Sequence, residues 1–346
     1  MTLHPQRPTL ETVARAAAVS RQTVSNVLNA PHLVREDTRR RVEDAIARIG
    51  YRPVKAAQAL RTRRSYLIAL GLQTSPDGVQ DAADDRGEVL HSFLHDLTER
   101  SQQRGYRILL YTAGSDDAEI AAYDALLGEY DLDAFVLTGT HTGDRRTDWL
   151  LSHGVPFVTF GRPWGSAARH PWVDVDGASG VRAATSHLIG AGHRRIGFLG
   201  WPEGSGVGDD RRSGWEQACR DAGLPVTGLS RRMRNSLAAG RAACARLLDA
   251  SASPTAFVCV SDVIALGAWA ELTARGLVPG TDVAVTGFDD SAAAAAAGLT
   301  SIAQPLADVA GACLDALQKL LASSAGRPLP SDGVLLEPRL VLRASG

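Results

Sequence analysis

Polar side chains gather in one short stretch near the start of the chain, SRQTVSNVLN at residues 20–29. At helical spacing Val24 and Leu28 share an apolar face, and the remaining surface carries four polar side chains, Arg21, Gln22, Ser25 and Asn26. An arginine can place two donors on a guanine edge, and the amide of Gln or Asn can pair with an adenine edge. The stretch therefore has the chemistry of a helix that reads bases in a DNA groove. The alternative interpretation is an ordinary solvated helix face.

The sequence on either side predicts the elements that would hold this helix. Thr9 precedes a first helical pattern in LETVARAAA, and Ser20 stands where the N-cap of the second helix belongs. A third pattern runs through residues 36–50 and stops at Gly50. Two helices joined by a tight turn, the second beginning with polar residues, form the helix-turn-helix arrangement. Hydroxyl groups in this region could hold phosphates, namely those of Thr9, Ser20, Thr23 and Ser25.

The charges of the chain are unevenly distributed. The net charge is only −1, but residues 1–66 hold 13 Lys and Arg against 5 Asp and Glu, and the remainder holds 24 against 33. A basic head on an acidic body indicates that the head alone meets a polyanion.

The rest of the chain predicts an α/β body. Its 346 residues exceed the size at which one core keeps growing. Short apolar runs alternate with longer amphipathic stretches, at residues 66–72, 106–112, 134–139, 156–160, 195–200, 255–260 and 283–288. This alternation predicts two doubly wound parallel-sheet lobes, with a ligand between them at the carboxyl ends of the strands.

Enzymatic and metal chemistry find little support in the residues. GSGVG at 204–208 follows a strand but lacks the full dinucleotide spacing, and Asp209 and Asp210 stand where a pyrophosphate needs a positive helix start. The cysteines, Cys219, Cys244, Cys259 and Cys313, lack the paired spacing of a zinc site, which predicts reduced thiols in or near the core. No nucleophile and base stand together around the histidines. We therefore expect no enzyme, no metal and no cofactor.

The N-terminal stretch MTLHPQRPT lacks the apolar region of a secretory signal, and no later run is long enough to span a bilayer. These features predict a cytoplasmic protein that does not bind membranes.

An ordered series of motifs resembles the lactose-repressor (LacI/GalR) family. In the head these are TLETVARAAAVSRQTVSNVLN, V-x-x-x-T-R at 34–39, Y-x-P at 51–53 and AAQALRTRRS at 56–65. In the body they include VDVDG at 173–177, GHRRIGFLG at 192–200, R-x-x-G-W at 211–215, TGFDDS at 286–291 and LTSIAQP at 299–305. The resemblance implies a helix-turn-helix DNA-binding domain at 1–53, a hinge helix and linker at 54–65, and a two-lobed effector-binding and dimerisation domain, similar to periplasmic binding proteins, at 66–346.

The resemblance also implies DNA contacts, position by position. The base-reading pair falls on Arg21 and Gln22, with Asn26 one turn later, and Leu60 of A-x-x-L falls on the leucine that wedges into the minor groove. The full implied set is Thr9, Ser20, Arg21, Gln22, Thr23, Ser25, Asn26, Asn29, Tyr51, Ala57 and Leu60. Val34-Arg35 replaces the favoured Val-Ser, which predicts a weakened N-cap for the third helix. Leu60 could instead pack under the body.

For the ligand, the resemblance places the arginine that holds hydroxyl groups at Arg211 and its acidic partner at Asp289. The other implied positions are Gln73, Thr138, Trp172, Trp201 and Ser261. A structural ion pair is the alternative for Arg211 and Asp289, and core packing is the alternative for either tryptophan. Ser261 stands where the family often has Asn, and Gly161-Arg162 replaces the common D-R.

Together these features predict a ligand-responsive repressor that binds a palindromic operator in double-stranded DNA as a homodimer and is released by a sugar or related polyhydroxylated effector. Three alternatives remain: a regulator co-repressed by a purine, a solute-binding protein without DNA function, and a Rossmann-type oxidoreductase.

Overall fold

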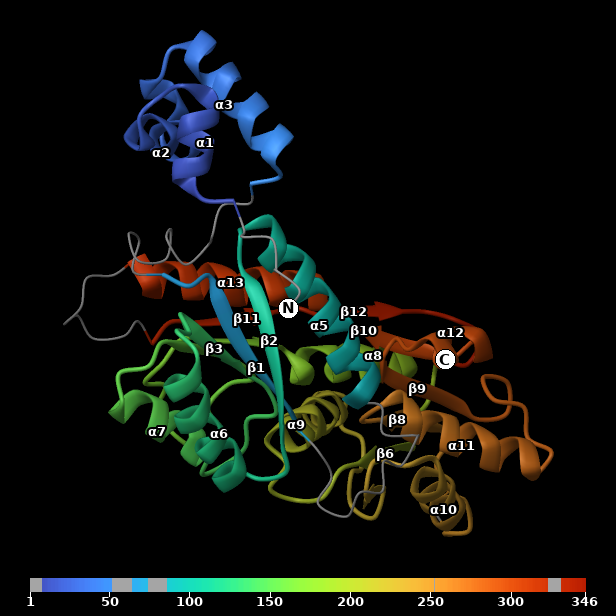
Figure 1. Ribbon diagram of the computed structural model, residues 1–346. Helices are drawn as coiled ribbons and strands as arrows, with labels where there is room; N and C mark the ends of the chain where they lie inside the picture. Colours follow the sequence, from blue (N-terminus) through green and yellow to red (C-terminus); the bar gives the residue numbers. More distant parts are fainter. Residues whose placement is uncertain (1–7, 52–63, 74–85, 252, 323–330) are drawn as a thin grey trace, which may run out of the picture. The chain divides into compact units, whose positions relative to one another are not determined.

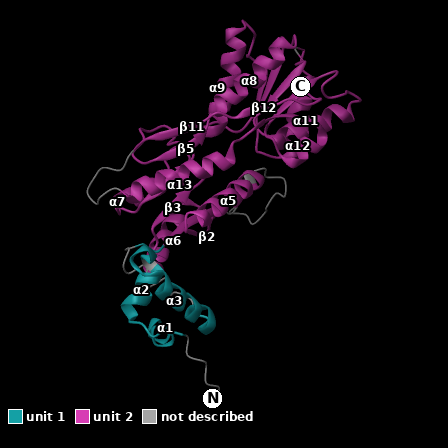
Figure 2. Cartoon of the chain, turned by 90° about the horizontal axis from the view of Figure 1, so that it is seen from above, with its two compact units in different colours: residues 1–65 teal, residues 66–346 magenta. Residues whose placement is uncertain are grey.

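The computed structural model describes residues 8–51, 64–73, 86–251, 253–322 and 331–346, and shows two compact units, Met1–Ser65 and Tyr66–Gly346 (Figures 1 and 2). Most of the predicted hinge, including Ala57 and Leu60, lies outside the described residues.

Three α-helices form the first unit, α1 Leu10–Ala17, α2 Arg21–Asn29 and α3 Glu36–Ile49, with a short 3-10 helix Pro31–Leu33 between the last two. Thr9 and Ser20 cap α1 and α2 with their side chains, whereas Arg35 gives α3 no side-chain cap, as Val34-Arg35 predicted. Gly50 ends α3 in the left-handed conformation, φ 66°. The small core is built from all three helices and includes Val13, Val24, Val42, Ala45 and Tyr51.

The second unit begins with a first lobe around a six-stranded sheet in the order β11-β5-β4-β3-β1-β2, all paired in parallel. Its strands are β1 Leu67–Gln73, β2 Arg107–Ala113, β3 Ala134–Leu137, β4 Phe157–Phe160, β5 Trp172–Val175 and β11 Gly333–Leu336. Its helices are α5 Arg86–Gln103, α6 Asp116–Glu129, α7 Arg145–Ser152 and α13 Leu306–Ala322. One core cluster joins the sheet to α5 and α13, with Phe93 and Leu314, and a second, with Tyr123 and Leu150, joins it to α6 and α7.

The second lobe has a sheet in the order β12-β10-β9-β8-β6-β7, parallel except for the antiparallel edge strand β12. Its strands are β6 Ile196–Gly200, β7 Ser230–Arg232, β8 Ala256–Cys259, β9 Ala284–Asp289, β10 Thr300–Ala303 and β12 Arg339–Val341. Its helices are α8 Gly177–Gly190, α9 Gly206–Asp221, α10 Leu237–Leu248, α11 Asp262–Ala274 and α12 Ala292–Ala297. Trp215 is fully buried and stacks on Phe198, with the two ring centroids 5.4 Å apart.

The chain passes between the lobes three times, from β5 to α8, from β10 to α13, and from β11 to β12. The predicted pair of doubly wound lobes is therefore confirmed, with each lobe assembled from separate segments. All four cysteines are free and buried, which confirms the thiol prediction. Within the described residues, no helix combines the length and apolarity needed to cross a membrane.

Candidate functional site

Helix α2 presents the predicted base-reading residues on its outer face. Arg21 and Gln22 are exposed and Asn26 is partly buried. The Gln22 Nε2 amide donates to Asn26 Oδ1 at 3.0 Å, so these two amides form one unit on the helix surface. Both amides keep further hydrogen-bonding groups, because each side chain has two donors and an acceptor.

The start of α2 combines a rigid cap with positive charge. Ser20 Oγ accepts from the Thr23 amide at 3.1 Å and lies 2.9 Å from the Thr23 hydroxyl. No acidic residue lies in the first turn of α2, so no nearby negative charge offsets the positive end of the helix dipole or the charge of Arg21. This is an arrangement that binds phosphate.

The other predicted DNA contacts have varied surroundings. Thr9 is exposed and forms a capping box with Thr12, and Ser25 is partly buried. Tyr51 is only 7% exposed and packs in the head core. Asn29 ends α2, and its side chain lies outside what the structure describes, as do Ala57 and Leu60.

In the second lobe, Arg211 lies on α9 with its side chain 6% exposed. Its Nη1 donates to the Val260 carbonyl at 2.6 Å, and its guanidinium lies 3.5 Å from the centroid of the Phe288 ring. The Asp289 carboxylate is 3.8 Å from Nη2, which is an ion pair rather than a hydrogen bond. Arg211 and Asp289 are thus brought together, as the resemblance implied.

Asp289 ends β9 in an unusual backbone conformation for a residue other than glycine, φ 112°. Its carboxylate accepts from Gln304 Nε2 at 2.6 Å. β9 and β10 are parallel neighbours, so Asp289 and Gln304 both lie at the carboxyl edge of the sheet. Strained backbone of this kind persists where the surroundings fix it and is frequent at binding sites.

Trp201 and Ser261 meet at Asn235. The Trp201 indole N–H donates to Asn235 Oδ1 at 3.0 Å, and the Ser261 hydroxyl donates to the same oxygen at 2.6 Å. The Trp201 ring centroid is 5.3 Å from the Arg211 guanidinium. We refer to Arg211, Asp289, Trp201, Ser261 and Asn235 as the Arg211 cluster.

The remaining predicted ligand residues lie in the first lobe. Gln73 ends β1, is exposed, and lies beside Gly139. Thr138 follows β3, is 9% exposed, and its carbonyl accepts from Arg146 at 3.1 Å. The Trp172 ring, on the first residue of β5, lies over Gly333 of β11.

A second polar group lies between α6 and α7. The Arg146 guanidinium, 1% exposed, binds Asp144 at 2.7 Å and Glu119 at 2.8 Å. Nearby, His141 Nε2 lies 3.0 Å from Asp116, and His141 Nδ1 faces the Thr142 carbonyl at 3.2 Å. Asp116, His141 and Asp144 hold their potential ligand atoms within 4.8 Å of one another, but the Arg146 cation lies within 4 Å of both carboxylates and disfavours a metal ion.

This arrangement shifts two pKa values. Burial lowers the pKa of His141, but the hydrogen bonds to Asp116 and the Thr142 carbonyl outweigh it, so that the pKa lies above its ordinary 6.5. Burial raises the pKa of Asp116, but His141 and Arg146 outweigh it, and the pKa lies below its ordinary value. Both ring nitrogens face acceptors, and only the protonated ring can donate to both.

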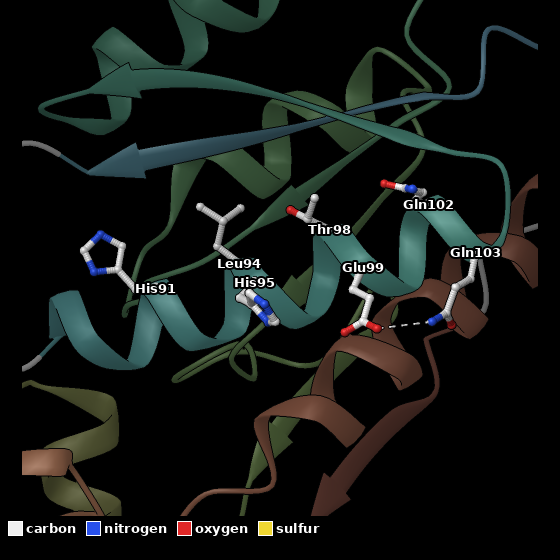
Figure 3. A pocket seen from close by; sticks show the side chains of 7 residues that line it. All are labelled: His91, Leu94, His95, Thr98, Glu99, Gln102 and Gln103. Carbon is white, nitrogen blue, oxygen red and sulfur yellow. Dashed lines mark hydrogen bonds between the residues drawn. The ribbon is translucent and has the colours of Figure 1, made fainter.

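Two surface hollows lie away from the Arg211 cluster. One, of about 720 Å³, follows a face of α5 from His91 to Gln103 (Figure 3). The other, of about 380 Å³, lies between α8 and α9. In the glycine-rich loop at 204–208 the Gly204 amide already has a partner within the protein, because it donates to Asp209 Oδ2 at 2.9 Å. That contact removes the donor and adds the negative charge that would deter a phosphate.

Asn235, Gln304 and Phe288 were not among the residues predicted from sequence. Asn235 follows β7, whose sequence SRR carries no apolar pattern that would mark a strand. Gln304 lies in the LTSIAQP motif, where its position at the end of a strand was the available signal.

Comparison with known proteins gives matches over both units. The family model described as bacterial regulatory proteins, lacI family, matches residues 9–54, and the model described as a periplasmic binding protein-like domain matches residues 185–346. The HTH-type transcriptional regulator CelR of Thermobifida fusca is 33% identical, over 99% of each chain.

Solved structures agree with these matches. A complex of the transcriptional regulator CelR with cellobiose is 31% identical, covers 98% of this chain and 100% of its own, and has a TM-score of 0.72. A lac repressor dimer bound to operator and the anti-inducer ONPF is 25% identical, covers 98% and 99%, and has a TM-score of 0.79.

Proposed function

Because this chain belongs to the lacI family of DNA-binding bacterial regulatory proteins, we propose that it is a repressor that binds a palindromic operator as a homodimer. A sugar or related polyhydroxylated ligand releases it. The observation that carries the proposal is the α2 face, where Arg21 and Gln22 are exposed on a capped helix in a strongly basic head.

Two heads are needed because one three-helix module reaches too few base pairs for specific binding. A two-fold dimer reads a palindrome, since each head meets an equivalent half-site. Leu60 of the hinge opens the minor groove by inserting between two base steps. The lac repressor structure, a dimer on its operator, supports this arrangement.

The Arg211 cluster is the proposed effector site. A guanidinium fork donates to hydroxyl oxygens, and a carboxylate accepts from hydroxyl groups, so the pair suits a ligand with many hydroxyls. Trp201 offers an aromatic face beside them. The cellobiose complex of CelR supports a sugar as the ligand class. Gln73, Thr138 and Trp172 are the proposed contacts from the first lobe.

Ligand binding brings the lobes together, alters the dimer contact and disorders the hinge helices, so that DNA affinity falls. The protein acts in the cytoplasm, where DNA and effector are both present. No cofactor, metal or catalytic residue takes part in this function.

The test is a binding series on genomic fragments at several salt concentrations, followed by a thermal-shift screen of cellobiose, maltose, lactose, glucose and purines. We expect a protected palindrome, affinity that falls steeply with salt, and stabilisation by a sugar that also releases DNA. Stabilisation by a purine that tightens DNA binding would replace the induced repressor with a co-repressed one. A chain that binds sugar but no fragment at any salt would be a solute-binding protein.

A further inference from the structure

Trp164 joins the two lobes through a contact that only glycine permits. It follows β4 of the first lobe, and its ring occupies the space where a Cβ on Gly206 would lie. Gly206 is the first residue of α9 in the second lobe. Any larger residue at position 206 would push the indole away.

Arg162 makes a second link to the same helix. Its guanidinium lies 4.8 Å from the centroid of the Trp164 ring. It donates to Asp174 of the first lobe at 2.7 Å and to Asp210 of α9 at 3.4 Å. Residues 206 and 210 are one turn apart, so Trp164 and Arg162 meet one face of α9.

The same helix carries Arg211. The arginine next to Asp210 turns to Val260 and Phe288 inside the second lobe, while Gly206 and Asp210 face the first. A rigid helix therefore connects the interlobe contact to the proposed effector site.

The stability of this contact depends on whether the Trp164 indole N–H finds a hydrogen-bond acceptor. The nitrogen is buried and has no hydrogen-bond partner within the described residues. A buried donor without an acceptor disfavours the arrangement that buries it. An oxygen supplied from outside the chain would remove this penalty.

We propose that Trp164 is a positioning residue for the effector: it seats on Gly206, holds the lobes together around the ligand, and is favoured when a sugar oxygen accepts from its N–H. This inference rests on the proposed function. It also accounts for two glycines of the loop at 204–208. Gly206 leaves space for the Trp164 ring, and a Cβ added to Gly208 would lie 3.0 Å from the Trp201 Cβ.

The experiment compares effector binding by the full chain and four variants, Gly206→Ala, Trp164→Ala, the double variant, and Gly190→Ala as a matched control. Neither glycine has a left-handed backbone, but an added Cβ meets nothing within 4 Å at Gly190. Cellobiose, maltose and glucose are the probes, affinity is measured by titration calorimetry, and thermal unfolding checks each fold.

We expect Gly206→Ala and Trp164→Ala each to weaken sugar binding about tenfold, because the closed arrangement becomes less populated. Gly190→Ala should bind like the wild type. The double variant should be no weaker than Trp164→Ala, since without the indole the added methyl group has nothing to displace.

The inference is overturned if Gly206→Ala binds as tightly as Gly190→Ala, or if the two single losses add in the double variant. A wild-type chain that binds none of the three sugars contradicts the sugar effector itself, and the inference with it. The wild-type titration therefore tests the proposed function, and the variants test the role of Trp164.

Discussion

Gln22 is proposed to read a base, and its side-chain amide also donates a hydrogen bond to Asn26 within the same helix. Gln22→Ala should change sequence preference at one or two base pairs of each half-site, at a cost of about 1–3 kcal/mol for a lost bidentate contact. Affinities for operator variants and for random DNA measure this. An equal loss on both kinds of DNA would make Gln22 a backbone contact.

Arg211 is the residue on which the effector site most depends. Arg211→Ala should require much more sugar for DNA release, with a loss of about 1.5–3 kcal/mol in ligand binding, because a charge-assisted hydrogen bond disappears. DNA affinity without ligand should stay near the wild-type value, since the head has its own core.

Arg212→Ala is the matched control for this change. Arg212 is the neighbour on α9 and pairs with Glu216 at 2.8 Å. Titration of DNA release with cellobiose compares the two variants. If both respond at the wild-type sugar concentration, Arg211 is only a structural ion-pair partner of Asp289.

Among the elements, the hinge around Leu60 is predicted from motifs alone. Leu60→Ala should weaken operator binding and reduce DNA bending while leaving the fold intact, because the wedge acts only when the minor groove is open. Circularly permuted operator fragments measure the bend. Unchanged affinity and bending would return Leu60 to a packing role.

His141, between β3 and α7, and Asp116, the first residue of α6, form a pH-sensitive pair. Because the pKa of His141 is raised in the folded chain, its contribution to stability is fully present below pH 6.5 and is lost as the pH rises through the folded value. Asp116, with a lowered pKa, loses its contribution only as the pH falls through its own folded value, at acid pH. Between these two limits the pair is charged on both sides.

His141→Asn should therefore abolish a small loss of thermal stability that the wild-type chain shows as the pH rises above about 6.5. The expected size is about 1–3 °C, because a half-exposed pair contributes less than about 1 kcal/mol. Thermal unfolding across this pH range, on both chains, gives the difference. A difference that does not vary with pH would assign His141 a purely steric role.

The elements also show what sequence could and could not predict. The helices of the head and seven strands were predictable because their apolar periodicity was strong, as in the buried strand AFVC of β8. β7 reads SRR, and β11 has three exposed residues of its four, so neither carries a buried pattern. Both are held by pairing with neighbours rather than by their own sequence.

The candidate site divides in the same way. Arg211 and Asp289 were predictable from motifs, and the structure brings them together. Asn235 and Trp164 were not predictable, because their contact partners are distant in the sequence. Ser261, the partner of Asn235, is 26 positions away, and Gly206, the partner of Trp164, is 42 positions away. Such contacts depend on the packing of separate lobes and leave no local pattern.

At the scale of the whole molecule, the proposed release of DNA by the ligand requires effector and operator to affect one another's binding through the full chain. Sugar binding in the presence of operator DNA should be weaker by the same factor as operator binding in the presence of sugar. Calorimetry with and without operator gives the first factor, and DNA titration with and without cellobiose gives the second. Two equal factors above one indicate induction, and two equal factors below one indicate co-repression.

A factor of one in both directions would mean that the two sites are independent, and the proposed regulatory mechanism would be wrong. Matched salt concentrations are essential in both titrations, because DNA affinity depends steeply on salt.

Because the chain passes between the lobes three times, the order of synthesis limits when each lobe can fold. The head forms from one continuous segment, whereas each lobe receives a strand from residues 333–341, and the first lobe also needs α13 at Leu306–Ala322. A nascent chain on the ribosome can thus fold its head early but can complete neither lobe until those residues have emerged. A product of aborted translation that ends before α13 would carry a complete DNA-reading head on a body unable to sense its effector. Because the proposed operator binding needs two heads, such a fragment would bind DNA only weakly and would not respond to the ligand.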